Sequence, residues 1–329
     1  MIISKAPFRI SFCGGGSDLP SFYRKHGGCV LSTTINYYVY ISVHPYFYGH
    51  KTLLKYSQTE LVDDIDKIDH RIFKQVLTDF GLTGVEITSM ADIPAGTGLG
   101  SSSSFTTALL NALYVYQGQR VSKPQIAKEA CEVEIEKLGN PIGKQDQYSA
   151  AFGGLNFIRF NPDDSVVVEP VLLAKETYKS LEKNLVMYYT GDVRSASAIL
   201  KEQNENMSDE DKVRNLQAMC TLASDMRDAL ERGDLTSFGG ILHENWLLKK
   251  TLANGITTDS VDELYDIAMR NGALGGKLLG AGGGGFLLFY CEEQNQERLR
   301  NALGLRELEF SFEHDGTSII FVNEPYIGR

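Results

Sequence analysis

Apolar residues recur along the chain with two different periods, which predicts a mixture of strands and helices. Segment 35–43 is rich in Tyr, Val and Ile and predicts a strand; a second strand is predicted over 84–90. Residues 69–80 between them have the pattern of a short helix. The clearest helix is predicted over 101–117, where one face carries the apolar residues Phe105, Ala108, Leu109, Ala112, Leu113 and Tyr116.

The remaining elements follow the same logic. A proline in the first turn predicts a helix from Pro124 to about Leu138, and another helix follows Asn140-Pro141. Strands are predicted over 155–160, 166–171, 184–189, 274–279 and 286–290, with helices between 189 and 271, a helix near 296–303 and two final strands. A charged stretch of weak pattern, 175–183, predicts a boundary between domains 1–178 and 179–329. The fold class is therefore α+β, with two sheet-and-helix layers.

Composition narrows the function classes. The chain has 329 residues, 43% hydrophobic and 22% charged, enough for two domains with their own cores. A net charge of −10 argues against non-specific binding to nucleic acid or to anionic membranes. The sequence contains no membrane-spanning apolar run, and Lys5 and Arg9 interrupt the first apolar segment, against a signal peptide. The five scattered cysteines lack a C-x-x-C pair, so we expect neither zinc nor disulfides, and a cytoplasmic location.

Glycine is the informative residue type. Of 32 glycines, three groups are clustered, at 14–16, 96–100 and 280–285. The middle cluster runs directly into the predicted helix at 101. Glycines let the backbone curl, so that several N–H groups and the helix N-terminus can point at one anion. The serines that follow can cap the helix, donate hydrogen bonds to phosphate or ligate Mg²⁺. The alternative is a glycine turn with one ordinary capping serine. The candidate phosphate-binding residues are Pro94, Gly96, Gly98, Leu99, Gly100, Ser101, Ser102, Ser103 and Ser104.

Two better-known glycine motifs are excluded. The P-loop pattern needs Ser or Thr after its lysine, but Lys277 is followed by Leu278. Residues 280–285 match G-x-G-x-x-G but lead into a predicted strand, whereas a dinucleotide fingerprint opens a helix.

Two carboxylates lie on helix faces that are otherwise apolar or small. Glu134 shares a stripe with Ala127, Ala130, Cys131 and Leu138. A buried carboxylate needs a partner, so Glu134 is a candidate metal ligand, the alternative being a structural ion pair. Asp146 lies beside small residues that leave room for a substrate, and it is a candidate base toward a sugar hydroxyl. The alternative for Asp146 is a helix cap.

The first glycine cluster places an acid and a base beside a strand end. Arg9 precedes it, and Asp18 follows Gly15, Gly16 and Ser17. Asp18 could accept hydrogen bonds from sugar hydroxyls, and Arg9 could face a phosphate or pair with an acid. The alternative is an ordinary strand followed by a turn, with no role in binding.

Taken together, the three glycine motifs resemble those of the GHMP kinases, the family of galactokinase, homoserine kinase and mevalonate kinase. The resemblance spans most of the chain, and Ser103 replaces a usual alanine. It implies a ribosomal-protein-like first domain and a ferredoxin-like second one, with ATP held at 94–104. It further implies Mg²⁺ on Ser102 and Glu134, Asp146 as base, and Arg9 as a second catalytic residue, in the first motif. The sugar would contact Gly15, Gly16, Ser17, Asp18, Gly282 and Gly283.

Within the family, segments 8–20 and 144–154 are most similar to members that phosphorylate the anomeric hydroxyl of D-glycero-D-manno-heptose 7-phosphate. The resemblance implies this reaction, in the making of nucleotide-activated heptose for surface polysaccharide. For the substrate's own phosphate, Arg194 with Ser195 and Ser197 is the first candidate, followed by Lys5 and Arg24; plain surface charge is the alternative for each. The competing functions are a kinase of an unphosphorylated sugar, of fucose or galactose type, and a non-catalytic sugar and ATP sensor. The oligomeric state is left open.

Overall fold

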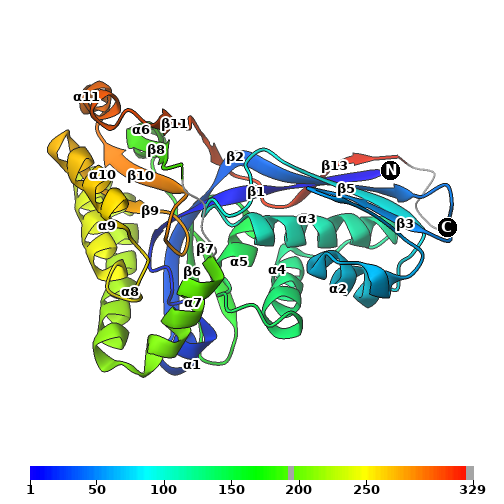
Figure 1. Cartoon of the computed structure of the whole chain (residues 1–329). Coiled ribbons are helices and arrows are strands. Elements are labelled where there is room, and N and C mark those ends of the chain that lie inside the picture. Colours follow the sequence, from blue (N-terminus) through cyan, green and yellow to red (C-terminus); the bar gives the residue numbers. More distant parts are fainter. Residues whose placement is uncertain (192–195, 324–329) are drawn as a thin grey trace.

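The computed structural model describes residues 1–191 and 196–323, which form two sheets with their helices (Figure 1). The larger sheet has nine strands in the order β13-β1-β2-β5-β3-β4, with β6 and β12 pairing onto β2 and β7 onto β6. Its strands are β1 Ile2–Cys13, β2 Gly28–Pro45, β3 Thr52–Lys55, β4 Thr59–Val62, β5 Val85–Ala91, β6 Asn156–Phe160, β7 Val166–Pro170, β12 Phe312–Glu313 and β13 Ser318–Val322.

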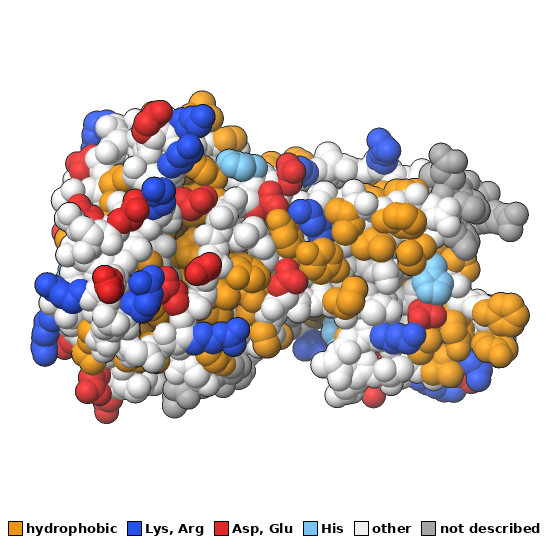
Figure 2. Space-filling model, turned by 90° about the horizontal axis from the view of Figure 1, so that it is seen from above, with side chains coloured by type: hydrophobic (Ala, Val, Ile, Leu, Met, Phe, Trp, Pro, Cys, Tyr) orange, Lys and Arg blue, Asp and Glu red, His pale blue; other side chains and the backbone are white. Residues whose placement is uncertain are grey.

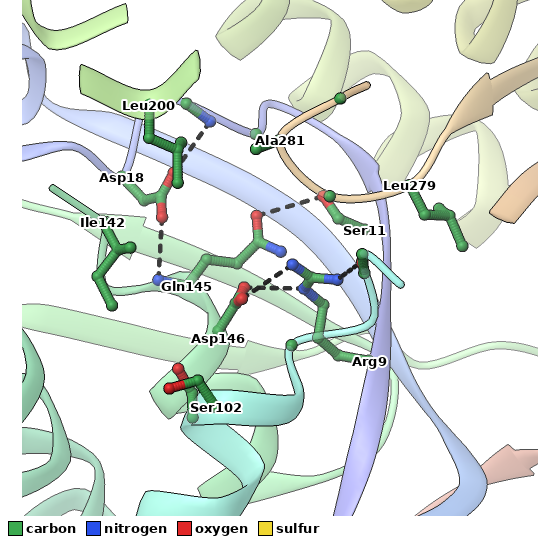
Figure 3. Close-up of a pocket in the computed structure, with 18 of the residues that line it drawn as sticks. Arg9, Ser11, Asp18, Ser102, Ile142, Gln145, Asp146, Leu200, Leu279 and Ala281 are labelled. Atoms are coloured by element: carbon green, nitrogen blue, oxygen red, sulfur yellow. Dashed lines mark hydrogen bonds and ion pairs between the residues drawn. The ribbon is translucent and has the colours of Figure 1, made fainter. Parts of the chain in front are cut away.

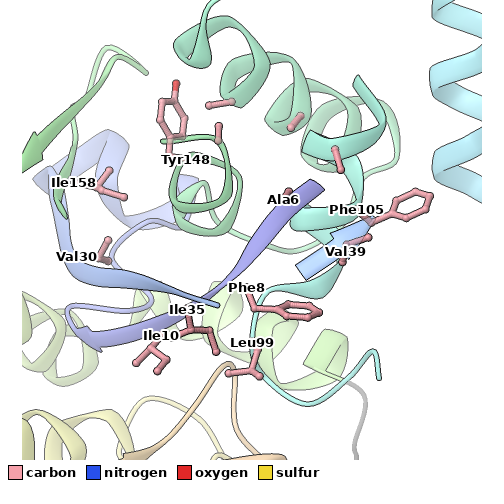
Figure 4. Close-up of a cluster of buried hydrophobic side chains, with 14 of the residues drawn as sticks. Ala6, Phe8, Ile10, Val30, Ile35, Val39, Leu99, Phe105, Tyr148 and Ile158 are labelled. Carbon is pink, nitrogen blue, oxygen red and sulfur yellow. The ribbon is translucent and has the colours of Figure 1, made fainter. Parts of the chain in front are cut away.

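Helices cover one face of this sheet, where α2 to α5 lie side by side (Figure 1). The helical elements of this part are α1 Pro20–His26, η1 Ile65–Lys67, α2 Arg71–Phe80, α3 Ser101–Tyr116, α4 Lys123–Cys131, η2 Glu132–Lys137 and α5 Gln145–Phe152. The core lies between the sheet and α3 (Figure 4), where Ala6 and Val39, which are paired across β1 and β2 and buried, lie beside Phe105 of α3. The other face of the sheet is free of these helices, and apolar side chains gather over it (Figure 2). Met90 of β5 is 58% exposed.

The smaller sheet has four antiparallel strands in the order β11-β8-β10-β9. Numbered along the chain, this order is 4-1-3-2, the ferredoxin-like arrangement, so the predicted fold of this part is confirmed. Its core contains the buried rings of Trp246, Tyr265 and Phe289. The elements are α6 Lys175–Asn184, β8 Leu185–Tyr189, α7 Ala196–Glu205, η3 Asn206–Ser208, α8 Glu210–Glu231, α9 Leu235–Lys249, α10 Asp259–Arg270, β9 Ala273–Leu278, β10 Phe286–Cys291, α11 Glu293–Leu303 and β11 Arg306–Glu307.

Three details differ from the sequence prediction. The helix expected from Pro124 to Leu138 ends as α-helix at Cys131 and continues as the π-helix η2, in which the Leu138 N–H donates to the Val133 carbonyl at 3.0 Å. The charged stretch 175–183 forms α6, which buries Leu181 as its single fully enclosed anchor. The chain then returns after β11, because β12 and β13 pair with β2 and β1.

The return of the chain affects the predicted division at residue 178. That residue falls inside α6, and residues 312–322 complete the sheet of the first part although they follow the second. The Phe312 N–H donates to Glu182 of α6 at 2.9 Å, so the two places where the chain crosses between the parts touch each other. Among the described helices, none is both long and apolar enough to cross a membrane.

Candidate active site

A cleft of about 330 Å³ opens where the two parts of the chain meet (Figure 3). Its walls come from the end of β1 and the first glycine loop, from the loop before α3, from the start of α5 and from the glycine loop after β9. The strands β1 and β9 and the helices α3 and α5 therefore each direct one end toward the same cavity. The lining includes Arg9, Gly15, Gly16, Asp18, Gly96, Gly98, Gly100, Ser101, Ser102, Ser103, Asp146, Lys249, Lys277 and Gly282.

The loop before α3 has the backbone that an anion site requires. Gly96, Gly98 and Gly100 have φ values of 83°, 85° and 79°, in the left-handed region that favours glycine. We expected a serine to cap the helix, and this was wrong: the N-cap is Gly100, and no side chain caps it. The serines instead occupy the first turn. The uncapped start of α3 therefore presents its backbone dipole to the cleft.

The third glycine loop packs directly against this loop. A Cβ on Gly98 would meet the carbonyl oxygen of Leu279, and one on Gly280 would lie 2.6 Å from the Cα of Gly98. Neither position has room for a side chain. The contact holds the loop from the second part of the chain against the start of α3.

Arg9 and Asp146 form the central ion pair of the cleft. The guanidinium Nε and Nη2 donate to the two Asp146 carboxylate oxygens at 2.8 and 2.9 Å, and Nη1 donates to the Gly98 carbonyl at 2.5 Å (Figure 3). The Arg9 N–H also donates to the Leu99 carbonyl at 3.0 Å. Such a bidentate pair fixes both partners in one geometry. The Asp146 side chain keeps 28% exposure, so it is open to the cleft while held in place.

Glu134 is fully buried and accepts three hydrogen bonds. The hydroxyls of Ser102 and Ser103 donate to its two oxygens at 2.5 and 2.8 Å, and the amide of Gln147 donates at 2.7 Å. Burial raises the pKa of Glu134, and the three donors oppose that rise. Among residues 1–191 and 196–323, no cation pairs with Glu134, so the alternative of a structural ion pair is not supported by the described contacts.

These residues fit a magnesium ion shared with a ligand. The described residues contain no group of three or more His, Cys, Asp or Glu side chains that would hold a metal alone. Mg²⁺ in phosphoryl-transfer sites uses one or two carboxylates together with substrate phosphate oxygens. Ser102 lines the cleft at the start of α3, and the Glu134 carboxylate, fully buried and outside the cleft lining, lies behind its hydroxyl. Together they supply the oxygen ligands that this arrangement needs.

Asp18 lies on the neighbouring wall with both carboxylate oxygens engaged. The Gly16 N–H donates to one oxygen at 2.9 Å and the Gln145 N–H to the other at 3.1 Å (Figure 3). Burial, followed by the charge of Asp146, raises the pKa of Asp18. Asp18 therefore links the first glycine loop to the start of α5, and it lines the cleft.

Several predicted site residues lie outside the cleft lining. The Ser17 hydroxyl bonds to the backbone of Cys29, the Ser104 hydroxyl donates to the Pro7 carbonyl, and Leu99 packs in the core. The Gly283 N–H donates to the Ile256 carbonyl at 3.1 Å, and Pro94 accepts from the Thr97 hydroxyl. These residues shape the loops rather than line the cavity.

The residues predicted to bind the substrate's phosphate do not all line the cleft. Arg194 and Ser195 lie outside the described residues, whereas Ser197 lines the cleft. Lys5 pairs with Glu313 at 3.4 Å and Arg24 with Asp164 at 3.1 Å, and neither lines the cleft.

Two lysines that the sequence reasoning missed line the cleft instead. Lys249 is 5% exposed at the end of α9, and Lys277 is 3% exposed in β9. Burial lowers the pKa of Lys249 to about 8. Burial and the nearby charge of Lys249 lower that of Lys277 to about 7. A signal was present: Lys249 continues the spacing of the buried residues Leu242 and Asn245, and Lys277 is a charge inside an otherwise apolar strand.

Comparison with known proteins adds independent information. Residues 68–154 match the family model of the GHMP kinases N terminal domain. Residues 226–307 match the model of the GHMP kinases C terminal domain. The chain is 30% identical to a D-glycero-alpha-D-manno-heptose 7-phosphate kinase of Campylobacter jejuni, over 96% of this chain and 97% of the relative. It is 27% identical to an L-fucokinase/L-fucose-1-P guanylyltransferase of Bacteroides fragilis, over 92% of this chain and 36% of that protein.

A solved structure is similar over nearly the whole chain. It is the crystal structure of a D-glycero-D-manno-heptose 1-phosphate kinase from Bacteroides thetaiotaomicron, with a TM-score of 0.80 and 27% identity. The similarity covers 98% of this chain and 100% of that one. The arrangement of both sheets is therefore shared.

Proposed function

Because the chain belongs to the GHMP kinase family of ATP-dependent kinases, we propose that it phosphorylates the anomeric hydroxyl of D-glycero-D-manno-heptose 7-phosphate, giving the 1,7-bisphosphate. The observation that carries the proposal is the Asp146 carboxylate, clamped by Arg9 and open to the cleft beside the uncapped start of α3. Similarity to a heptose 7-phosphate kinase over almost the full length supports the choice of sugar.

The loop before α3 would hold the β- and γ-phosphates of ATP. Its glycines turn the backbone toward the cleft, and the N-terminus of α3 contributes a partial positive charge of roughly half a unit. Ser102 and Glu134 would hold Mg²⁺, which neutralises charge on the transferring phosphoryl group when bound. This is how a chain of net charge −10 can bind a triphosphate.

Asp146 would act on the sugar hydroxyl. Its carboxylate accepts the hydroxyl proton as the sugar oxygen forms a bond to the γ-phosphorus and the bond from that phosphorus to the β–γ bridging oxygen breaks, releasing ADP. Arg9 keeps the carboxylate oriented through two hydrogen bonds and ties it to the Gly98 carbonyl of the phosphate loop. Base and phosphate loop are thereby held in a fixed relation, which is the main requirement of phosphoryl transfer.

An ADP-release screen tests the proposal. The chain is incubated with ATP, MgCl₂ and sugars offered with and without a terminal phosphate, and the phosphorylated product is identified by NMR. We expect the highest kcat/KM with the heptose 7-phosphate and a new phosphate on its anomeric carbon. Phosphorylation at another carbon, or an absence of ADP with every sugar, would contradict the proposal; the second result would favour a sensor.

The second candidate is a kinase of an unphosphorylated sugar. It is supported by the similarity to the L-fucokinase, which covers 92% of this chain. The same screen separates the two candidates, because a fucose or galactose kinase would prefer the sugar without a phosphate.

A further inference from the structure

Lys249 and Lys277 form a cationic wall of the cleft. The phosphoryl-transfer steps described above assign no role to either lysine. The Lys249 ammonium donates to the Gly15 carbonyl at 3.1 Å and to the Gln203 Oε1 at 3.2 Å. Among the described residues, no acceptor lies within hydrogen-bonding distance of the Lys277 ammonium, and no carboxylate pairs with it. Both side chains are at least nine-tenths buried and line the cavity.

The charges on this wall do not balance. The positive groups are Arg9, Lys249 and Lys277, and they lie close enough for Arg9 and Lys249 to lower the pKa of Lys277, after burial, the largest cause. Of the two nearby acids, Asp146 is paired with Arg9, and the charge of Asp18 acts on Lys249, so three cations face two carboxylates. An unpaired buried cation is costly unless a bound anion compensates it.

A second observation points to a ligand at the same place. The Nε2 of Gln203 is buried and has no acceptor among the described residues, although the Oε1 of the same amide holds Lys249. Gln203 is 1% exposed and is not itself in the cleft lining, so it would act from directly behind Lys249, which is. A buried N–H group without an acceptor is uncommon in folded proteins, and an anion beside Lys249 would supply the acceptor.

The position of this wall separates it from the nucleotide. The ATP phosphates are assigned to the loop before α3, whereas Lys249 and Gln203 border the first glycine loop, where a Cβ on Gly16 would lie 3.3 Å from the Lys249 Nζ and 3.3 Å from the Gln203 Oε1. Resting on the proposed function, we propose that Lys249 and Lys277, with the Gln203 amide, bind a phosphate ester carried by the sugar substrate. A neutral sugar would leave these groups unpaired, so the wall selects phosphorylated sugars.

Direct binding without ATP tests this subsite. Calorimetry compares D-glycero-D-manno-heptose 7-phosphate with the same heptose lacking the phosphate, on the wild-type chain and on Lys277→Met, which keeps the side-chain volume and removes the charge. The preference for the phosphorylated sugar should fall at least about tenfold, the loss typical of a charge-assisted hydrogen bond. Lys277→Arg should retain most of it. Lys5→Met, a lysine outside the cleft, is the matched control and should leave the preference unchanged.

Two further measurements keep the test decisive. Lys249→Met should lower the same preference, which covers the case in which the Lys277 variant does not fold by circular dichroism. The KM for ATP should not rise in either variant. An equal loss for both sugars, or a raised KM for ATP alone, would overturn the subsite.

The outcomes distinguish this inference from the proposed function. A wild-type chain that prefers the phosphorylated sugar in binding but never releases ADP would keep the subsite and contradict the kinase reaction. A chain that turns over both sugars with equal kcat/KM would keep the kinase and overturn the subsite.

Discussion

The Arg9 guanidinium donates to both carboxylate oxygens of Asp146, a residue 137 positions later in the chain. It also donates to the Gly98 carbonyl, so one side chain joins β1, the start of α5 and the loop before α3. The position of the candidate base is thus set by the same group that fixes the candidate phosphate loop.

Replacement of the base should abolish turnover without loss of nucleotide. Asp146→Asn keeps the shape but cannot take a proton, so kcat should fall by about 10²- to 10⁴-fold, the usual contribution of a general base. The affinity for ATP, measured by fluorescence or calorimetry, should stay within about twofold. The exposed Asp266→Asn on α10 is the control. Near-normal turnover in Asp146→Asn would refute the role of base.

A lysine cannot replace the arginine. Arg9→Lys keeps the charge but loses the planar fork that grips Asp146 and reaches Gly98. Small displacements of a reacting group cost up to about 10²-fold in rate, so we expect a large fall in kcat, measured by ADP release. Full activity of Arg9→Lys would show that the second and third hydrogen bonds of the guanidinium are dispensable.

The buried carboxylate should control the metal requirement. Glu134→Gln removes the negative charge, so half-maximal activity should need at least about tenfold more MgCl₂, because a carboxylate is the protein's main contribution to a Mg²⁺ site of this kind. The measurement is ADP release against MgCl₂ concentration at fixed ATP. Glu136→Gln, exposed on the same π-helical segment, serves as the control. Identical MgCl₂ curves for the two variants would exclude Glu134 as a ligand.

The contact between two glycine loops can be separated from backbone strain. Gly98→Ala adds a Cβ that collides with the Leu279 carbonyl at a φ of 85°, whereas Gly139→Ala has a φ of 64° and open space around it. A left-handed non-glycine residue costs roughly 1–2 kcal/mol in either case. Urea unfolding should show the larger loss for Gly98→Ala, with a raised KM for ATP only there. Equal losses would mean that the loops adjust freely.

Recognition of a phosphorylated sugar should weaken as the pH rises. Lys277 and Lys249, whose pKa values are lowered to about 7 and about 8, lose their charge above those values. Phosphate esters gain their second charge near a pKa of about 6, so the ligand does not cause a loss above pH 7. The affinity for the heptose 7-phosphate should fall about tenfold or more between pH 6.5 and 9.

Three other groups face these two lysines and contribute to the pH dependence of binding. They are Arg9 and Cys13 on β1 and Asp18 beside the first glycine loop. The unphosphorylated heptose serves as the reference because it carries no charge for the lysines to bind. If the affinities for the two sugars change in parallel with pH, the lysines do not bind the phosphate.

The pattern of apolar residues predicted an element well where that element's own apolar face determines which of its side chains are buried. The helix predicted over 101–117 is α3, Ser101–Tyr116, because its apolar face alone specifies it. The cap was wrong because Gly100 takes the left-handed conformation and leaves the serines in the first turn. Stretch 175–183 looked irregular because α6 buries little besides Leu181.

The candidate site was predictable where motif residues act through backbone or through an acid on a buried face. Glu134 and Asp146 became candidates from their helix positions, and their roles as metal ligand and base stay predictions. Lys249 and Lys277 were missed because their burial depends on packing between α9, β9 and a glycine loop more than 200 residues away in sequence, and a lysine on a helix ordinarily lies at the surface.

The return of the chain to the large sheet limits how the protein can be divided. Without β13, residues Ile2 to Lys5 of β1 would present an unpaired strand edge, and the separation of 1–178 as a fragment removes both β12 and β13. Open edges of this kind recruit other chains. Expression of the first half alone should therefore give aggregates, and a soluble nucleotide-binding half will need residues 312–323 supplied as a separate peptide or through a designed linker.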